Sequence, residues 1–167
     1  ACVPMHTIGL PMYIDDLVKV CNQYHIPVVE DACQSILGAI DGKNAGTWGY
    51  AGTFSLHPLK NINVWSDGGV IVTDDYELDK KLRLLRNHGL KDRDTVAIMG
   101  YNSRLDTIQA VVGNWILPQA KDISETNMRE IKTPWGLLSP EVELFPIYYL
   151  IFIYGFIYIL PFGEYFV

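Results

Sequence analysis

The chain has 167 residues, of which 49% are hydrophobic and 19% are charged, a balance that supports a packed core and excludes an intrinsically disordered protein. This length suits one domain or a large part of one. The formal net charge of -6 and the pI near 5.1 argue against a non-specific nucleic-acid-binding protein, which needs a basic surface, but allow a local site for a small anion.

The cysteines and histidines predict neither a disulfide scaffold nor a metal site. The chain has 3 cysteines without C-x-x-C spacing and 4 histidines without metal-ligand spacing. This pattern favours a reducing compartment, and we expect the cytoplasm. The N-terminus shows no secretory signal, and because it opens without methionine we expect an internal piece of a longer protein.

The first predicted helix lies in the segment IDDLVKVCNQY, which begins at Ile14. Asp15 and Asp16 fall in its first turn, where the helix dipole favours negative charge. One face carries the apolar residues at helical spacing, Ile14, Leu17, Val18 and Cys21. Pro27 ends any such helix, and residues 27–31 read as a short buried strand that finishes in two acids.

Two more strands and another helix are predicted in the middle of the chain. AGTFSL (51–56) and GGVIVT (68–73) are strand candidates, and a stretch rich in Gly, Asn and Pro separates them. Asp74 is the expected N-cap of the following helix, with Glu77 as its capping-box partner. The apolar stripe of this helix comprises Leu78, Leu82 and Leu85, and RNHG ends it.

A last helix is predicted after the polar loop DRDTVAIMGYN, with Ser103 or Asp106 at its start. Its apolar residues are Leu105, Ile108, Val112 and Trp115. Helices therefore alternate with short apolar strands. This alternation predicts an α/β fold with three layers, in which helices flank a mostly parallel sheet.

Chemically active side chains follow two of the predicted strands. VVEDACQ carries Asp31 and Gln34, and FSLHPLKN carries Ser55 and Lys60. Open α/β sheets bind ligands beyond the carboxyl ends of their strands. An acid and a lysine there can form a plain salt bridge, or Lys60 can be a solvated surface charge. They also suit pyridoxal phosphate, which needs a lysine amine for its attachment and an acid that faces the pyridine nitrogen.

Five blocks occur in order along the chain: PVVEDACQS, GKNAGTWGYAGTFSLHPLKN, DGGVIVTDD, LRLLRNHG and GYNSRLDTIQA. Through them the sequence resembles the pyridoxal-phosphate-dependent sugar aminotransferases of the DegT/DnrJ/EryC1/StrS family, from about Val3 to about Gln119. The resemblance implies a fold-type I transferase, similar to aspartate aminotransferase. It also implies that residues 1–130 are part of the large cofactor-binding domain.

The resemblance assigns roles to five residues. Lys60 matches the lysine that binds the cofactor covalently and then moves protons, and Asp31 matches the acid that pairs with the pyridine nitrogen. Gln34 matches a residue beside the ring, near its phenolic oxygen, and Ser55 matches a hydroxyl donor to the phosphate. Asn102 matches an asparagine that reaches a phosphate in the neighbouring subunit, which implies a homodimer. Each of these residues also has a purely structural alternative. Asp31 can be a strand-end cap, Gln34 a surface glutamine, Ser55 a turn serine, and Asn102 a loop or helix-capping asparagine.

The implied reaction is the transfer of an amino group from an amino acid, with glutamate as the expected donor, to a keto group on a nucleotide-linked deoxysugar. The product serves polysaccharide or glycosylated-metabolite synthesis. One alternative is a sugar dehydratase of the same family; some relatives carry a histidine in place of the lysine, and Lys60 disfavours this reading. The other is an inactive or membrane-attached remnant. Since family members are longer, we expect the isolated chain to be an inactive fragment.

The C-terminal part of the chain departs from this pattern. Residues 131–143 are expected to form a divergent linker and residues 144–167 an apolar tail. Residues 144–162 carry no charge over a length that suffices for a tilted membrane span, although Pro146 and Pro161 weaken a regular helix. We interpret the tail as foreign to the fold, with a membrane anchor or a buried element of a longer protein as the alternatives.

Overall fold

The computed structural model describes residues 1–7, 9 and 11–124. The predicted linker 131–143 and the apolar tail 144–167 lie outside these described residues. None of the helices in the described part combines the length and the apolar character that crossing a membrane requires.

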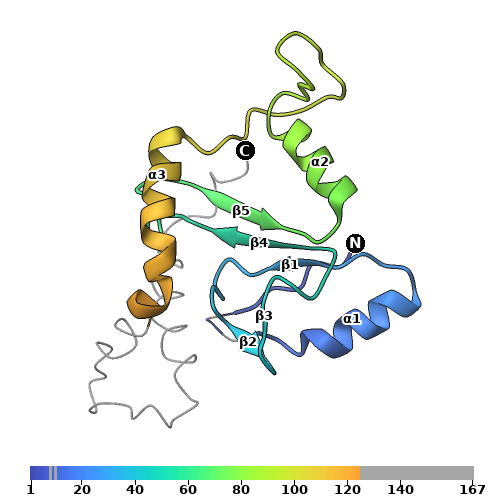
Figure 1. Cartoon of the computed structure of the whole chain (residues 1–167). Helices are drawn as coiled ribbons and strands as arrows, with labels where there is room; N and C mark the ends of the chain where they lie inside the picture. The colour runs from blue at the N-terminus through green and yellow to red at the C-terminus, as the bar shows by residue number, and fades with distance from the viewer. Residues whose placement is uncertain (8, 10, 125–167) are drawn as a thin grey trace, which may run out of the picture.

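A three-stranded sheet with the order β1-β4-β5 lies at the centre of the described residues (Figure 1). Its strands are β1 (Val29–Asp31), β4 (Ala51–Ser55) and β5 (Gly69–Val72). β1 and β4 are parallel, with Asp31 opposite Thr53, whereas β4 and β5 are antiparallel. The N-terminal segment extends the sheet beyond β1 through parallel bridges from Cys2 and Met5.

The predicted α/β class is confirmed, and the sheet of the described residues is mixed. β1 and β4 pair in parallel as expected. β5 runs the other way because the chain between β4 and β5 contains no helix in residues 56–68. A parallel neighbour needs a crossover that carries the chain back to the starting edge, and an irregular loop instead lets the next strand return antiparallel.

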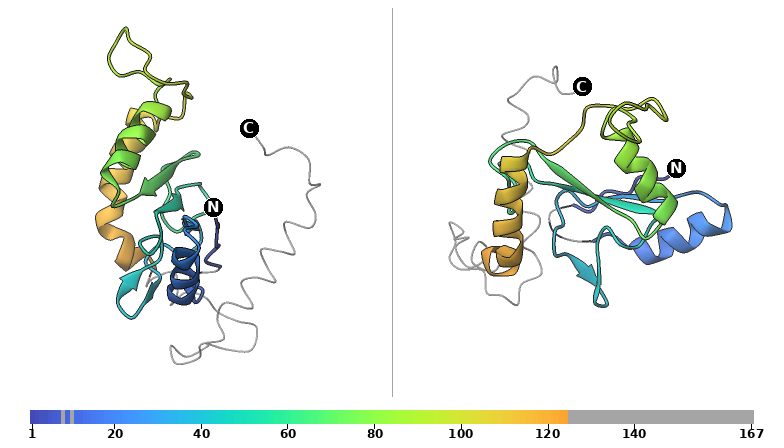
Figure 2. Two further views of the ribbon diagram at one scale, coloured as in Figure 1. Left: turned by 90° about the vertical axis from the view of Figure 1, so that its right-hand side faces the viewer. Right: turned by 45° about the horizontal axis from the view of Figure 1, so that its top comes forward.

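In the part of the chain that the structure describes, three helices and a small hairpin pack around the sheet. The helices are α1 (Ile14–Gln23), α2 (Tyr76–Leu85) and α3 (Thr107–Ile116), and the last continues into the 3-10 turn η1 (Leu117–Gln119). β2 (Ala39–Ile40) and β3 (Lys43–Asn44) form an antiparallel hairpin. Seen at right angles to the first view, α2 and α3 lie on one side of the three-stranded sheet (Figure 2, left).

Two apolar clusters form the core of the described residues. α1 buries Ile14 and Cys21 against Val28, just before β1. The second cluster contains Leu56, Ile62, Val64 and Ala120, and joins the loop after β4 to the C-terminal end of α3. The first cluster therefore packs at the start of β1, and the second packs the loop that follows β4.

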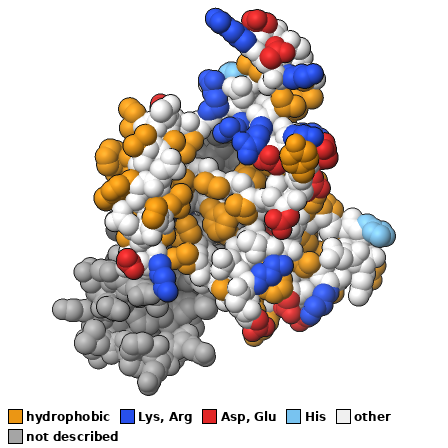
Figure 3. All heavy atoms as spheres, in the orientation of Figure 1, with side chains coloured by type: hydrophobic (Ala, Val, Ile, Leu, Met, Phe, Trp, Pro, Cys, Tyr) orange, Lys and Arg blue, Asp and Glu red, His pale blue; other side chains and the backbone are white. Residues whose placement is uncertain are grey.

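α3 keeps much of its predicted apolar surface exposed. Val112 is buried, but Ile108 and Trp115 are 70% and 68% exposed. Hydrophobic side chains accordingly gather over α3 on the molecular surface (Figure 3). The apolar spacing thus predicts the helix correctly, although it does not determine which apolar residues are covered.

The N-cap of α2 is Asp75 and not Asp74 as the sequence pattern suggests, because the Leu78 backbone N–H donates to Asp75 Oδ1 at 2.8 Å. We expect Asp75→Ala to lower the free energy of unfolding by about 1 kcal/mol, the usual cost of losing an N-cap acceptor. Urea unfolding followed by circular dichroism measures this loss, with the neighbouring Asp74→Ala as the matched control. Equal effects of the two substitutions would contradict the cap.

Candidate functional site

The carboxyl ends of β1 and β4 lie at the same edge of the sheet because the two strands are parallel. Asp31 is the last residue of β1, and Ser55 is the last residue of β4. The loop that carries Lys60 follows directly after Ser55. Three of the five predicted site residues therefore come from two adjacent strand ends, as expected from the sequence.

Asp31 is held by the N-terminal segment beside β1 and by the turn that follows β1. Its backbone N–H donates to the Pro4 carbonyl at 2.8 Å, and its own carbonyl accepts from the His6 N–H at 2.9 Å. Its side-chain Oδ1 accepts from the Cys33 N–H at 3.1 Å. The carboxylate is half-buried, so it has a defined position and remains open to a ligand.

The turn from Ser55 to Lys60 is held by contacts within itself. The His57 N–H donates to Ser55 Oγ at 3.3 Å, and the Lys60 N–H donates to the His57 carbonyl at 2.9 Å. The Leu59 N–H donates to His57 Nδ1 at 3.1 Å. Ser55 accepts in this turn, which leaves its hydroxyl hydrogen for an acceptor such as a phosphate oxygen. His57 thus forms the turn through its backbone and its ring nitrogen.

Asp31 and Lys60 both act on the thiol of Cys33. Burial is the main cause that raises the pKa of this thiol, and the hydrogen bond and charge of Asp31 raise it further. A hydrogen bond from Thr53 and the positive charge of Lys60 act in the opposite direction. The acid and the lysine are therefore close enough to the same side chain for both to influence its ionisation.

Gln34 and Asn102 are the other two predicted site residues. Gln34 is exposed in the turn after β1, where its carbonyl accepts from the Gly9 N–H at 2.8 Å. Asn102 is exposed on the segment between α2 and α3 and forms a bridge with Asn87. Within the described residues, no hydrogen bond joins Asn102 to the edge that carries Asp31 and Lys60. Its role in a neighbouring subunit stays a prediction.

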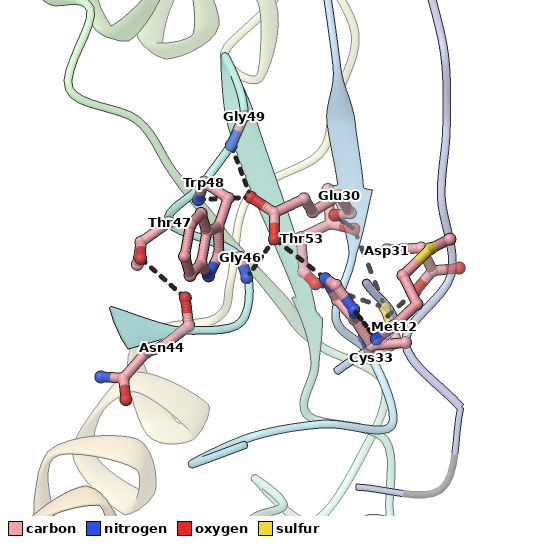
Figure 4. A network of polar contacts seen from close by, with 11 residues as sticks. Met12, Glu30, Asp31, Cys33, Asn44, Gly46, Thr47, Trp48, Gly49 and Thr53 are labelled. Carbon is pink, nitrogen blue, oxygen red and sulfur yellow. Dashed lines mark hydrogen bonds and ion pairs between the residues drawn. The ribbon is translucent and has the colours of Figure 1, made fainter. Parts of the chain in front are cut away.

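Glu30 carries a polar network that the sequence patterns do not reveal (Figure 4). The side chain is 0% exposed, and backbone amides of one loop surround it. The N–H groups of Trp48 and Gly49 donate to Oε1 at 2.6 and 2.7 Å, and the Gly46 N–H donates to Oε2 at 2.8 Å. Gly46 has φ +82°, a left-handed conformation that glycine adopts without steric cost.

His6 completes this network and is itself 0% exposed. Its Nδ1 accepts from the Met12 N–H at 3.2 Å, so the ring hydrogen resides on Nε2. Nε2 donates to Glu30 Oε2 at 2.9 Å. The carboxylate thereby receives four donors, which satisfy a charge that would otherwise be costly to bury.

The two acids that end β1 therefore have separate roles. Successive strand residues point to opposite faces, so Glu30 points away from Asp31. Glu30 fixes the loop 46–49 inside the protein, while the half-buried Asp31 carboxylate accepts from the Cys33 N–H in the turn after β1. An acid within an apolar strand is the one sequence signal for such a site, because it demands donors from somewhere else in the fold.

The sequence matches the model of the DegT/DnrJ/EryC1/StrS aminotransferase family over residues 1–134. Over 112 residues the chain is 42% identical to a UDP-N-acetyl-3-dehydro-alpha-D-glucosamine 3-aminotransferase from Acidithiobacillus ferrooxidans. That match covers 67% of this chain and 30% of the relative.

Solved structures are also similar to this chain. A DegT/DnrJ/EryC1/StrS aminotransferase from Brucella abortus superposes with a TM-score of 0.70 at 31% identity, covering 76% of this chain and 35% of the other. A GDP-4-keto-6-deoxy-D-mannose-3-dehydratase from E. coli, with bound hydrated pyridoxal phosphate, gives a TM-score of 0.65 at 27% identity, covering 72% and 36%. The chain thus spans about a third of the length of these relatives.

Proposed function

The chain belongs to the DegT/DnrJ/EryC1/StrS aminotransferase family, whose aminotransferases depend on pyridoxal phosphate, and from this premise we propose that it forms cofactor-binding structure of a nucleotide-sugar transaminase. The proposed reaction moves an amino group from an amino acid, with glutamate as the donor, to a keto group on a nucleotide-linked deoxysugar. The relative from Acidithiobacillus ferrooxidans, named as an aminotransferase of a UDP-linked sugar, supports this substrate class.

The arrangement of Asp31 and Lys60 is the observation that carries the proposal. An acid, an amine and the Ser55 hydroxyl follow two adjacent parallel strands, and these groups fit the ring nitrogen, the aldehyde and the phosphate of the cofactor. The Cys33 N–H holds the acid in place, and the turn 55–60 is held by its own hydrogen bonds. The donor set therefore suits the cofactor that the family uses.

Each residue then has a defined task. Pyridoxal phosphate, when bound, supplies an electron-accepting ring for chemistry at the carbon that bears the amino group. Lys60 binds the cofactor through Nζ and moves a proton at the same atom. Asp31 keeps a positive charge on the pyridine nitrogen through its carboxylate. Ser55 donates its hydroxyl hydrogen to the phosphate, and Gln34 lies beside the ring.

We also propose a homodimer in which Asn102 reaches the phosphate of the neighbouring subunit. Its exposure, and its distance along the chain from the other site residues, are compatible with contact to a second copy. The proposed location is the cytoplasm. Because the chain spans about a third of its relatives' length, we expect the 167 residues alone to show no transamination.

A dehydratase reaction is the second candidate, because one structural relative is a keto-deoxymannose dehydratase. The family resemblance links that chemistry to a histidine at the position of Lys60. Lys60 therefore favours amino transfer. Following the nitrogen of isotopically labelled glutamate into the sugar distinguishes the two reactions, because a dehydratase removes a hydroxyl group from the sugar.

The proposal predicts that Lys60 is the site of covalent cofactor attachment. After incubation with pyridoxal phosphate and reduction with borohydride, peptide mass spectrometry should find the pyridoxyl group on Lys60. Lys91→Ala serves as the control, because Lys91 is an exposed loop residue outside the proposed site and its loss should leave labelling unchanged. A label spread over surface lysines, with none on Lys60, would contradict the proposal.

A further inference from the structure

Cys33 lies between the two strands that carry the proposed site, and the proposed reaction gives it no task. Its N–H donates to Asp31 Oδ1 at 3.1 Å, and its Sγ lies 3.8 Å from the Thr53 carbonyl oxygen and 3.9 Å from Thr53 Oγ1. Asp31 and Thr53 are register partners in β1 and β4. One turn residue therefore touches both strands directly at the edge where the cofactor is proposed to bind (Figure 4).

The hydrogen bonds around Thr53 determine which group donates. Thr53 Oγ1 donates its single hydrogen to the Glu30 carbonyl at 3.1 Å, so it can only accept from Cys33. The thiol is therefore the donor in its contact with Thr53. The thiol therefore ties the turn after β1 to β4, while the backbone N–H of the same residue holds the Asp31 carboxylate.

The ionisation of the thiol supports its role as a donor. Burial, and then the hydrogen bond and negative charge of Asp31, raise the pKa of Cys33, while Thr53 and Lys60 oppose this change. The charged groups that face the thiol are thus Asp31 from β1 and Lys60 from the loop after β4. With its pKa raised, the thiol keeps its proton at neutral pH and can donate it.

We propose that Cys33 is a positioning residue that holds the carboxylate of Asp31 at the sheet edge shared with Lys60. The inference rests on the proposed function, in which Asp31 faces the pyridine nitrogen of the cofactor. The backbone N–H of Cys33 holds Oδ1 of Asp31, and the S–H anchors the same residue to Thr53 of β4. A side chain without a donor loses the contact with Thr53, so the turn that presents the Cys33 N–H to Asp31 is no longer tied to β4 by this side chain.

The first test needs no cofactor. Iodoacetamide alkylates thiolates, so the alkylation rate of Cys33, followed across pH by peptide mass spectrometry, reports the ionisation of the thiol. Asp31→Asn should speed alkylation near neutral pH by about three- to tenfold, because it removes the negative charge that opposes the thiolate. Lys60→Ala should slow it. Cys2, which is also half-buried but packs beside α1, is the control within the same chain and should not respond.

The second test measures the affinity for pyridoxal phosphate by the quenching of tryptophan fluorescence. Cys33→Ala should weaken binding by about two- to tenfold, the range expected for one hydrogen bond. Cys33→Ser should recover most of the loss, since it restores a donor of similar size. A substitution that acts only through packing would not be rescued by the smaller polar serine.

The two tests separate the inference from the proposed function. If the native chain does not bind pyridoxal phosphate, the proposed function fails, and the alkylation rates still decide whether Cys33 contacts Asp31. If native and Cys33→Ala chains bind the cofactor equally, the positioning role is wrong while the proposed function stands. An alkylation rate that is indifferent to Asp31→Asn and Lys60→Ala also overturns the inference.

Discussion

Replacement of Lys60 by alanine is expected to lower the turnover of a transaminase that contains this chain by at least about a hundredfold. General acid–base groups contribute about a hundredfold to ten-thousandfold to a rate, and Lys60 also supplies the amine that binds the cofactor. Lys60 is half-buried in a turn that is fixed by the hydrogen bond from its N–H to the His57 carbonyl. We therefore expect that no lysine from elsewhere in the chain can take its place. Steady-state kinetics with glutamate and a nucleotide-linked keto-sugar measure the loss.

Two further variants identify the cause of that loss. Lys60→Arg keeps the positive charge but has no amine that can lose its proton, so it should be as inactive as the alanine variant. Lys91→Ala, in the exposed loop after α2, should retain normal turnover. Near-normal activity of Lys60→Ala would remove this lysine from the proposed mechanism, and an active Lys60→Arg would reduce its role to that of a charge.

Replacement of Glu30 by glutamine is expected to cause the largest loss of stability, about 3 kcal/mol in the free energy of unfolding. The carboxylate accepts four hydrogen bonds, from His6, Gly46, Trp48 and Gly49. A glutamine of the same size places an NH₂ group against two of these donors. Those donors then stay buried without an acceptor, which costs more than the loss of an ordinary hydrogen bond.

Urea unfolding followed by circular dichroism measures this effect, and Glu77→Gln is the matched control. Glu77 pairs with Lys80 at 3.0 Å on the exposed face of α2, where such a pair contributes little. Glu77→Gln should therefore leave the unfolding midpoint nearly unchanged. If Glu30→Gln unfolds at the native midpoint, the amides of loop 46–49 are satisfied without the carboxylate.

The local features of this protein follow from neighbouring residues and can be predicted from the sequence. Asp106, one of the two starts that the sequence pattern offers, caps α3 with a capping box that includes Gln109, three residues further on. Asp75 and Asp74 show the limit of such prediction. Adjacent acids are both suitable caps, and only the backbone geometry selects Asp75, whose side chain reaches the Leu78 N–H.

Part of the candidate site could be predicted, because the parallel direction of two strands brings its residues to the same edge of the sheet. Asp31 and Ser55 end two strands, and once β1 and β4 pair in parallel, both residues lie at one edge. The family pattern identifies Lys60 among the lysines of the chain. The antiparallel direction of β5 has no such signal, because it depends on the path of the loop 56–68 across the sheet.

By itself the sequence determined the α/β class, the family, and the order of the helices and strands around Asp31 and Lys60, because these depend on periodic patterns and on residues near one another in the chain. Only the tertiary structure decided the partners of Glu30 and Cys33. The amides that bind Glu30 lie 16 to 19 residues away, and the contact of Cys33 with Thr53 spans 20 residues. A buried carboxylate or thiol must find partners wherever the fold brings them, and no local pattern specifies that meeting.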